Sequence, residues 1–441
     1  MHKNVIGIRR EDKNQWEIRV PLIPEDVNDL IKNHGFRVIV QPSEDHRAFS
    51  DQSYIDVGAE ISEDLSDADI IVGVKEIPEI KFIPEKTYMF FAHVIKGQAY
   101  NMSMLNALMQ KNCSLIDYEK IESDDGKRLI FFGRFAGIAG MVETLSAYGK
   151  RMAHEGVDNP FERIEQPYHY NSLAECVGKI WELSHDILEN GLPEEIKPFI
   201  IGVTGYGNVS KGAQEIVDLL PVTTISADDL RRGLEHLPPS RTGMYKVVFE
   251  EKDMFQPKDP AKPFDLEDYF KNPHQYKGIF AQTAPMLSVM ANCIFWTDAC
   301  PRLLTKSDVK NIYSVANPKL KVIGDISCDI EGSVEATVAI TDLDTPCFVY
   351  DVDEDYAVPG YTGNGPAIMS IENLPCEIPA EASHEFSGVL KNLFPGMANA
   401  DFSKPLDKSG LPNEIKRAVI VLKGSLTDTY KYIEKSLAEN I

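Results

Sequence analysis

The chain has 441 residues, a length that predicts two or three domains, because soluble domains usually contain about 150 residues. Hydrophobic residues make up 43% and charged residues 26%, which is typical of globular proteins and excludes disordered and collagenous classes. The 68 acidic and 45 basic side chains give a formal charge of -23. Such a field disfavours nucleic acid and anionic membrane surfaces as partners.

The seven cysteines are scattered and form no C-x-x-C pair, which favours neither disulfides nor a zinc site. No apolar run approaches the roughly 20 residues that span a bilayer. The N-terminal sequence MHKNVIGIRREDKNQWE is charged on both sides of a short apolar stretch, unlike a signal peptide. We therefore expect a cytoplasmic protein that uses no metal ion.

The first third of the chain alternates short apolar runs with amphipathic stretches, which is the pattern of β-α-β units. Residues 24–34 predict a helix that ends at Gly35, because glycine is favoured just after a helix. Strands are predicted at residues 5–8, 36–40, 70–74, 88–92 and 114–117.

The middle of the chain begins with two predicted helices at residues 136–155 and 172–190. Residues 199–204 then form an apolar strand that leads into GYGNVSKGA and an amphipathic helix. A polar, proline-rich insertion over residues 231–276 contains one short strand at 246–249. Further strands are predicted at 278–282, 321–325 and 347–351, before a mostly helical tail. This order of elements predicts an α/β fold with two Rossmann-like domains.

The glycine-rich segment Gly205-x-Gly207-x-x-Ser210 lies between an apolar strand and an amphipathic helix, as in a dinucleotide-binding turn. Its backbone can approach a pyrophosphate, and the N–H groups at the helix start provide partial positive charge. Ser210 replaces the usual third glycine, so a plain strand-to-helix connection is the alternative. The candidate cofactor-binding residues are Gly205, Tyr206, Gly207, Asn208, Val209 and Ser210.

Ionisable residues follow several predicted strands. Lys75, His93 and Glu119 lie at or just beyond strand ends in the first domain, and Asp325 ends a strand in the second. Because ligands bind beyond the carboxyl ends of parallel strands, these four residues are candidates for acid–base chemistry. The alternatives are a solvated surface lysine and a hydrogen-bonded structural histidine.

Several motifs become recognisable together, and they occur in one order along nearly the whole chain. They are GIRREDKNQWEIRVPLIP, GVKEIPE, FFAHVIKGQAYN, LIDYEKI, FGRFAGIAGM, VTGYGNVSKGAQ, GDISCDIEGSVE and IENLPCEIPAEAS. The set resembles the lysine-2-oxoglutarate reductase half of aminoadipic semialdehyde synthase, and more widely the lysine-forming saccharopine dehydrogenases, alanine dehydrogenase and nicotinamide nucleotide transhydrogenase. The resemblance implies a catalytic domain of residues 1–135 completed by C-terminal helices in 376–441, with an NAD(P)-binding Rossmann domain of residues 136–375 inserted between them.

Residue by residue, the resemblance implies that Lys75 and His93 form the acid–base pair and that Glu119 tunes it. Glu17 and Arg19 resemble a substrate-binding E-x-R pair. A guanidinium suits bidentate binding of a carboxylate, although an ordinary surface ion pair is the alternative. Asp325 matches the aspartate beside the nicotinamide ribose and the substrate.

Two further positions concern substrate and cofactor choice. Arg134 stands where related chains carry an uncharged residue, and we include it among the candidate substrate-binding residues. Asp228 and Asp229 follow the expected second strand of the Rossmann domain, which favours NAD(H), whereas Arg231 and Arg232 offer partners for the 2'-phosphate of NADP(H). The resemblance favours NADP(H).

The function implied by the resemblance is the reductive condensation of L-lysine and 2-oxoglutarate to saccharopine, the first step of lysine degradation. A separate, glutamate-forming saccharopine dehydrogenase is then expected as the partner enzyme for the next step. Two alternatives stay open: a saccharopine dehydrogenase that works toward lysine with NAD, and a non-catalytic regulator that binds a nucleotide.

Overall fold

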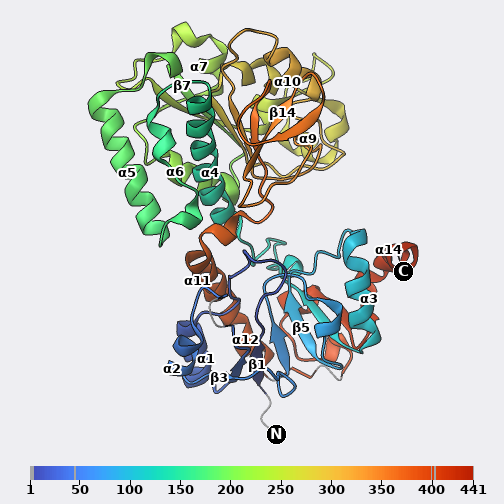
Figure 1. Ribbon diagram of the computed structural model, residues 1–441. Coiled ribbons are helices and arrows are strands. Elements are labelled where there is room, and N and C mark those ends of the chain that lie inside the picture. Colours follow the sequence, from blue (N-terminus) through green and yellow to red (C-terminus); the bar gives the residue numbers. More distant parts are fainter. Residues whose placement is uncertain (1–3, 44–45, 399, 402–403, 441) are drawn as a thin grey trace. The chain divides into compact units, whose positions relative to one another are not determined.

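The computed structural model describes residues 4–43, 46–398, 400–401 and 404–440 and divides into two compact units (Figure 1). Unit 1 comprises residues 1–132 and 379–441, and unit 2 comprises residues 133–378. The chain therefore leaves unit 1 once, forms unit 2, and returns to unit 1.

The sheet of unit 1 has the strand order β18-β17-β6-β5-β4-β1-β2-β3. Strands β1 to β6 are parallel, whereas β17 and β18 come from the C-terminal segment and pair in antiparallel fashion beyond β6. The expectation of a mostly helical tail missed these two strands. The strands are β1 (Val5–Ile8), β2 (Arg37–Val40), β3 (Glu60–Ile61), β4 (Ile70–Val72), β5 (Thr87–Phe90), β6 (Ser114–Asp117), β17 (Val419–Leu422) and β18 (Ser425–Leu426).

Helices cover the apolar strands of this sheet. The first, α1 (Pro24–His34), has proline in its first turn and ends at Gly35, whose left-handed φ of 71° lets its N–H bond to the carbonyl of Ile31. This helix and the five strands predicted in the first third are confirmed to within two residues. The other helices are α2 (Asp51–Asp56), α3 (Met102–Gln110), α11 (Pro379–Leu390), α12 (Phe394–Met397), α13 (Asn413–Ala418) and α14 (Glu434–Asn440).

Unit 2 contains a second sheet with the order β15-β14-β16-β13-β12-β7-β9-β8. Its strands β7, β8, β9, β12, β13 and β16 are parallel, and β14 and β15 are antiparallel additions at one edge. The α/β fold with two Rossmann-like sheets is confirmed. The strands are β7 (Phe199–Thr204), β8 (Thr223–Ile225), β9 (Met244–Phe249), β12 (Val289–Asn292), β13 (Val322–Asp325), β14 (Cys347–Asp351), β15 (Tyr356–Pro359) and β16 (Ala367–Met369).

The strand predicted at residues 278–282 is wrong. Strand β11 (Tyr276–Gly278) instead pairs with β10 (Phe255–Pro257) in a separate two-stranded antiparallel sheet. Short 3-10 helices follow at Phe280–Gln282 and Ala284–Met286. Pro285 lacks an N–H and favours such a turn over a central strand. The strand of the main sheet is instead β12, seven residues further on.

Two helices of unit 2, α4 (Gly133–His154) and α6 (Asn208–Val217), lie side by side on one face of the sheet (Figure 1). A Cβ on Gly212 of α6 would lie 1.9 Å from the backbone oxygen of Arg134 on α4, so only glycine allows this approach. The remaining helices are α5 (Leu173–Asn190), α7 (Ala227–Arg231), α8 (Glu251–Met254), α9 (Leu266–Lys271) and α10 (Lys306–Ile312).

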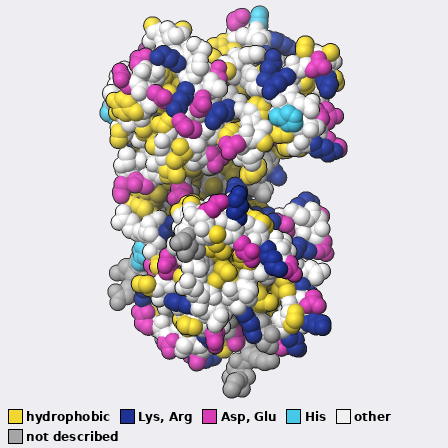
Figure 2. Space-filling view, turned by 90° about the vertical axis from the view of Figure 1, so that its right-hand side faces the viewer, with side chains coloured by type: hydrophobic (Ala, Val, Ile, Leu, Met, Phe, Trp, Pro, Cys, Tyr) yellow, Lys and Arg dark blue, Asp and Glu magenta, His cyan; other side chains and the backbone are white. Residues whose placement is uncertain are grey.

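The surface carries charges of both signs despite the net charge of -23. On the face drawn in Figure 2, acidic and basic side chains are mixed over each unit. Recognition of a charged ligand must therefore depend on local groups rather than on a uniform field. Within the described residues, no helix combines the length and the apolar character needed to cross a membrane.

Candidate active site

Three candidate residues of unit 1 follow three neighbouring parallel strands. Lys75 lies three residues beyond β4, His93 three residues beyond β5, and Glu119 two residues beyond β6. Because β4, β5 and β6 are adjacent and parallel, their carboxyl ends meet at one edge of the sheet. The structure thus brings these three side chains to the same edge.

His93 is held in a fixed orientation. Its backbone has a left-handed φ of 48°, and the Nδ2 atom of Asn101 donates to the carbonyls of Ala92 at 3.0 Å and of His93 at 3.3 Å. The Nδ1 atom of the ring lies 2.5 Å from Oε1 of Glu76. Among the described residues, the opposite ring atom, Nε2, has no hydrogen-bond partner, which leaves it available to a substrate.

Glu76 connects the histidine to a cation. Its Oε2 accepts from Nζ of Lys13 at 2.8 Å. Burial raises the pKa of Glu76, but its hydrogen bonds to His93 and Lys13 outweigh burial and hold that pKa well below the usual range. Glu76 is therefore a carboxylate at neutral pH and fixes which ring nitrogen of His93 faces away from it.

The amine of Lys75 is half-buried and forms no hydrogen bond or ion pair with the described residues. Burial and the nearby charge of Arg19 lower its pKa. The backbone beneath it is anchored, because the N–H groups of Val74 and Lys75 donate to the two carboxyl oxygens of Glu11 at 2.8 and 3.0 Å. A lysine in these surroundings gives up its proton more readily than a surface lysine and can act as a base.

Glu17 and Arg19 form a buried bidentate pair, not a surface ion pair. Nε of Arg19 donates to Oε1 of Glu17 at 2.8 Å, and Nη2 donates to Oε2 at 2.5 Å. Neither side chain exposes more than 1% of its surface. The guanidinium carbon lies 4.2 Å from the ring centre of Phe132, which adds a cation–π contact.

The C-terminal helix α11 holds the segment that carries this pair. Oγ of Ser383 accepts from the N–H of Val20 at 2.9 Å, and Oγ of Ser387 accepts from the N–H of Ile23 at 2.9 Å. Ser387 also donates to Oδ2 of Asp26 at 2.6 Å. Residues more than 360 positions apart therefore fix the E-x-R segment in one conformation.

A layer of aromatic rings supports the same edge. Phe91 stacks on His93 with ring centres 6.1 Å apart, and Phe132 stacks on Phe386 with centres 4.6 Å apart. Phe91 and Phe386 are 6.0 Å apart and join the two pairs. This packing restricts the rotation of His93 and excludes water from one side of Arg19.

Glu119 lies in an acidic neighbourhood that sequence reasoning described only in part. Its Oε1 is 4.0 Å from Nη1 of Arg128, and its N–H donates to Oδ1 of the buried Asp117 at 2.9 Å. Burial, followed by the charge of Glu119, raises the pKa of Asp117 to about 7. Asp117 is therefore present in both its protonated and its ionised state near neutral pH, in electrostatic contact with His93.

The glycine-rich turn of unit 2 has the geometry of a phosphate cradle. Gly205 follows β7 with a left-handed φ of 80°, and a Cβ there would press on Ile294 at 3.1 Å. Gly207 is the N-cap of α6, has no side-chain cap, and faces open space. The N–H groups of Asn208, Val209 and Ser210 form the first turn, so the residues present fit a pyrophosphate. Tyr206 is 46% exposed beside them.

Asp325 ends β13 and belongs to a buried hydrogen-bond network. Its Oδ1 accepts from Asn292 at 2.8 Å and from Ser327 at 2.6 Å, while Oδ2 accepts from Thr337 at 2.6 Å. Oγ1 of Thr204 donates to Oδ1 of Asn292 at 3.1 Å. The ends of β7, β12 and β13 are therefore joined, and burial raises the pKa of Asp325 despite these bonds.

Two other candidates lie in unit 2 with carboxylate or cationic partners. Arg134 begins α4 and forms a bidentate pair with Glu215 of α6, both distances being 2.7 Å. Asp228 is paired with Arg231 at 2.7 Å on α7 and is 77% exposed. The structure does not place Arg134 in the unit that holds Glu17 and Lys75.

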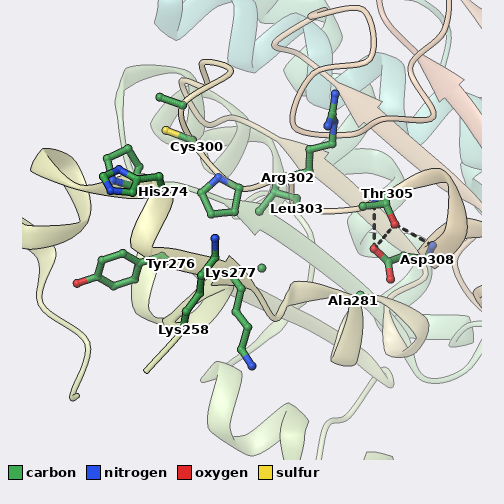
Figure 3. Close-up of a pocket in the computed structure, with 14 residues that line it drawn as sticks. Lys258, His274, Tyr276, Lys277, Ala281, Cys300, Arg302, Leu303, Thr305 and Asp308 are labelled. Atoms are coloured by element: carbon green, nitrogen blue, oxygen red, sulfur yellow. Dashed lines mark hydrogen bonds between the residues drawn. The ribbon is translucent and has the colours of Figure 1, made fainter. Parts of the chain in front are cut away.

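A cavity of about 430 Å³ lies in unit 2, between the β10–β11 hairpin and the segment that precedes α10 (Figure 3). Lys258, His274, Cys300 and Arg302 are among its lining residues. None of the candidate residues and no residue of the glycine-rich turn lines this cavity, so the cavity is not part of the candidate active site. No cluster of potential metal ligands occurs within the described part of the chain.

Sequence reasoning missed Glu76, Asp117, Glu11 and Lys13. A signal for the first was present, because Glu76 follows Lys75 in GVKEIPE and extends the same strand end. Asp117 is the last residue of a predicted strand and satisfied the criterion that selected Asp325. Nothing in the sequence pairs Glu11 with residues 74 and 75, since that contact depends on β1 and β4 being neighbours.

Known proteins share this architecture and sequence. Residues 7–139 match the family model described as alanine dehydrogenase/PNT, N-terminal domain. Alpha-aminoadipic semialdehyde synthase from Arabidopsis thaliana is 37% identical over 99% of this chain and 42% of its own length. The NAD(+), L-lysine-forming saccharopine dehydrogenase from Yarrowia lipolytica is 26% identical over 86% of this chain and 89% of its own. A solved L-alanine dehydrogenase matches with a TM-score of 0.64 and 18% identity, covering 99% of this chain and 100% of that one.

The two Rossmann-like sheets, with ionisable groups at the strand ends of one and a glycine-rich turn in the other, give the chain the fold of the solved L-alanine dehydrogenase. Residues 7–139 are similar to the N-terminal domain of the alanine dehydrogenase/PNT family, and the fold of a solved L-alanine dehydrogenase extends over 99% of the chain. The chain is similar along its whole length to one part of the alpha-aminoadipic semialdehyde synthases, and it spans about half the length of those relatives.

Proposed function

We propose that the protein catalyses the nicotinamide-dependent condensation of L-lysine with 2-oxoglutarate to give saccharopine. The observation that supports this most directly is the grouping of Lys75 and His93 at one sheet edge of unit 1, where burial and then the charge of Arg19 lower the pKa of Lys75. An amine with a depressed pKa and an imidazole fixed by a carboxylate are the groups that imine formation requires. Similarity over 99% of the chain to an alpha-aminoadipic semialdehyde synthase supports lysine as a substrate.

The chemistry divides among the residues of unit 1. Lysine reaches the site as an ammonium ion, and Lys75 accepts the proton that must leave before the amine attacks the ketone carbon. Nε2 of His93 then donates a proton to the carbinolamine oxygen, which departs as water to leave an imine. Glu76 stabilises the charge that the ring carries before this transfer.

Arg19 binds a substrate carboxylate in this proposal. Glu17 holds its guanidinium in one orientation, so little conformational entropy is lost when a ligand binds. Phe91, Phe132 and Phe386 exclude water around the reacting atoms and limit hydrolysis of the imine. Residues 205–210 of unit 2 would hold the dinucleotide, which would supply the hydride for reduction of the imine.

The reverse reaction uses the same groups, and a relative of similar length is named for it. Oxidation of saccharopine gives an imine, water adds to it, and lysine leaves with a proton returned to its amine. Mass-action ratios in the cell, not these residues, set the direction. A cytoplasmic location and a separate glutamate-forming saccharopine dehydrogenase as the next enzyme remain part of this proposal.

The test mixes the purified protein with reduced dinucleotide, lysine and 2-oxoglutarate, follows loss of nicotinamide absorbance, and identifies the product by mass spectrometry. Lys75→Met and His93→Gln are each expected to lower kcat/KM by about 10²–10⁴-fold. Lys179→Met and His185→Gln serve as controls, because both side chains are more than half exposed in unit 2. Oxidation without a requirement for both substrates would reject the assignment. Dinucleotide binding without turnover of any pair would favour the regulator alternative.

A further inference from the structure

The strand order of unit 2 changes which residues border the glycine-rich turn. In the common dinucleotide-binding fold, the second strand in sequence lies beside the first, and an acidic residue at its end binds the adenosine ribose. Here the second strand, β8, lies at the sheet edge, and the third, β9, lies beside β7. All six residues of β7 pair with β9, from Phe199 with Met244 to Thr204 with Phe249.

The residues at the ribose position are therefore Glu250 and Glu251, not Asp228. The N–H of Gly205 donates to the carbonyl of Phe249 at 2.9 Å, so Glu250 directly follows the residue bonded to the turn. Burial and then the charge of Glu251 raise the pKa of Tyr206, which places this second glutamate beside the turn as well. Asp228 follows β8 and is separated from β7 by the whole of β9.

The charges around this position are mostly negative. Lys252 is paired with Oε2 of Glu250 at 2.8 Å. Arg231 is paired with Asp228 at 2.7 Å, and its Nη2 donates to the carbonyl of Asp253 at 2.8 Å. Arg232 is paired with Asp229 at 3.3 Å, so each of these three cations already has an acidic partner.

We propose that Glu250 and Glu251 make the protein selective for NAD(H) over NADP(H). Their carboxylates accept hydrogen bonds from the 2'- and 3'-hydroxyls of an adenosine ribose and repel a 2'-phosphate, which carries a charge of about -2 at neutral pH. This choice is opposite to the one that family resemblance suggests. The inference rests on the proposed function only in requiring that a dinucleotide bind at the glycine-rich turn.

The experiment measures binding without catalysis. NADH and NADPH are titrated separately into the purified protein in the absence of lysine and 2-oxoglutarate, and dissociation constants are obtained by isothermal titration calorimetry and nicotinamide fluorescence. The protein is expected to bind NADH at least tenfold more tightly than NADPH. Raising the salt concentration is expected to bring the two dissociation constants closer together, because ions screen the repulsion between the two glutamates and the 2'-phosphate.

A charge reversal identifies the residues responsible. Glu251→Arg supplies a guanidinium that pairs with a phosphate, and it is expected to shift the NADH/NADPH affinity ratio by at least tenfold toward NADPH. Glu250→Gln is expected to shift the ratio in the same direction by a smaller factor. Glu267→Arg, whose parent side chain is 87% exposed on α9, should leave the ratio unchanged. Asp228→Asn tests the position that sequence order alone suggests, and it should also leave the ratio unchanged.

The outcomes separate the two proposals. The cofactor inference is overturned if the unmodified protein binds NADPH more tightly than NADH. It is also overturned if the NADH/NADPH affinity ratio changes with Asp228→Asn and not with Glu251→Arg. Either result leaves the proposed reaction intact. Selective NADH binding without condensation of lysine and 2-oxoglutarate would reject the reaction and retain the inference. Failure to bind either dinucleotide would overturn both. If a variant fails to fold, the ratio measured for the unmodified protein still decides the question.

Discussion

Asp117 makes the stability of unit 1 depend on pH in a predictable direction. The side chain is buried, Oδ1 accepts one hydrogen bond from the backbone of Glu119, and Oδ2 has no partner among the residues that the structure describes. Burial and then the charge of Glu119 raise its pKa from 3.8 to about 7. The protonated form is therefore favoured by the folded state. Its stabilising contribution is fully present below pH 3.8 and is lost as the pH rises through about 7.

The substitution Asp117→Asn removes this titration and keeps the oxygen that accepts from Glu119. A shift of roughly three pKa units corresponds to about 4 kcal/mol of stability lost by the unmodified protein at high pH. About a third of this stability is already lost at pH 5, because Asp117 is ionised at that pH in the unfolded chain. The variant is therefore expected to gain about 3 kcal/mol relative to the unmodified protein between pH 5 and pH 9.

The measurement is urea unfolding at both pH values. Trp16 is the tryptophan of unit 1, whereas Trp181 and Trp296 lie in unit 2, so replacing those two by phenylalanine makes fluorescence report unit 1. Asp124→Asn is the matched control, because that side chain is 84% exposed and should change stability by less than about 0.5 kcal/mol at either pH. A stability difference for Asp117→Asn that stays constant with pH would refute the reasoning.

Four further substitutions have expected outcomes. Ser387→Ala removes the hydroxyl that donates to Oδ2 of Asp26 and accepts from the N–H of Ile23, and it should lower the free energy of unfolding of unit 1 by about 1–3 kcal/mol in urea titrations. Gly212→Ala places a Cβ 1.9 Å from a backbone oxygen of α4, so the Tm of the protein and its affinity for the dinucleotide should both fall. As the matched control, Gly178→Ala in α5 meets no atom within 4 Å and should stabilise the protein by up to about 1 kcal/mol. Lys75→Arg keeps the positive charge but cannot release a proton near neutral pH, so kcat should fall by at least about 10²-fold across a pH–rate profile. Near-normal activity for this variant would exclude Lys75 as a base.

The local parts of the fold were predictable because their signals are local. Alternation of apolar and amphipathic runs identified β1, β4 and β6, and Gly35 identified the end of α1. The positions of Lys75 and His93 followed from one rule about the carboxyl ends of parallel strands. That rule requires only that the strands be parallel and needs no knowledge of their order.

Features that depend on strand order were not predictable. Asp228 was chosen by counting strands along the sequence, whereas the ladder of β7 with β9 places Glu250 beside the turn. The insertion of residues 231–276 was expected to contain one short strand at 246–249, and β9 (Met244–Phe249) lies there, but its place beside β7 could not be predicted. Pairing is decided by packing between distant segments, which composition within a short window does not report.

The return of the chain to unit 1 explains why a C-terminal motif belongs to the construction of an N-terminal site. Arg19 is buried, and a buried guanidinium without partners destabilises a fold by several kcal/mol, so Glu17 must be held against it. The segment that carries both residues depends on Ser383 and Ser387 of α11 for the hydrogen bonds of its backbone. The same helix contributes Phe386, which stacks on Phe132 beneath Arg19. The motif IENLPCEIPAEAS therefore supplies no candidate ligand, but the E-x-R pair keeps its geometry only when helix α11, which begins within this motif at Pro379, is packed against unit 1.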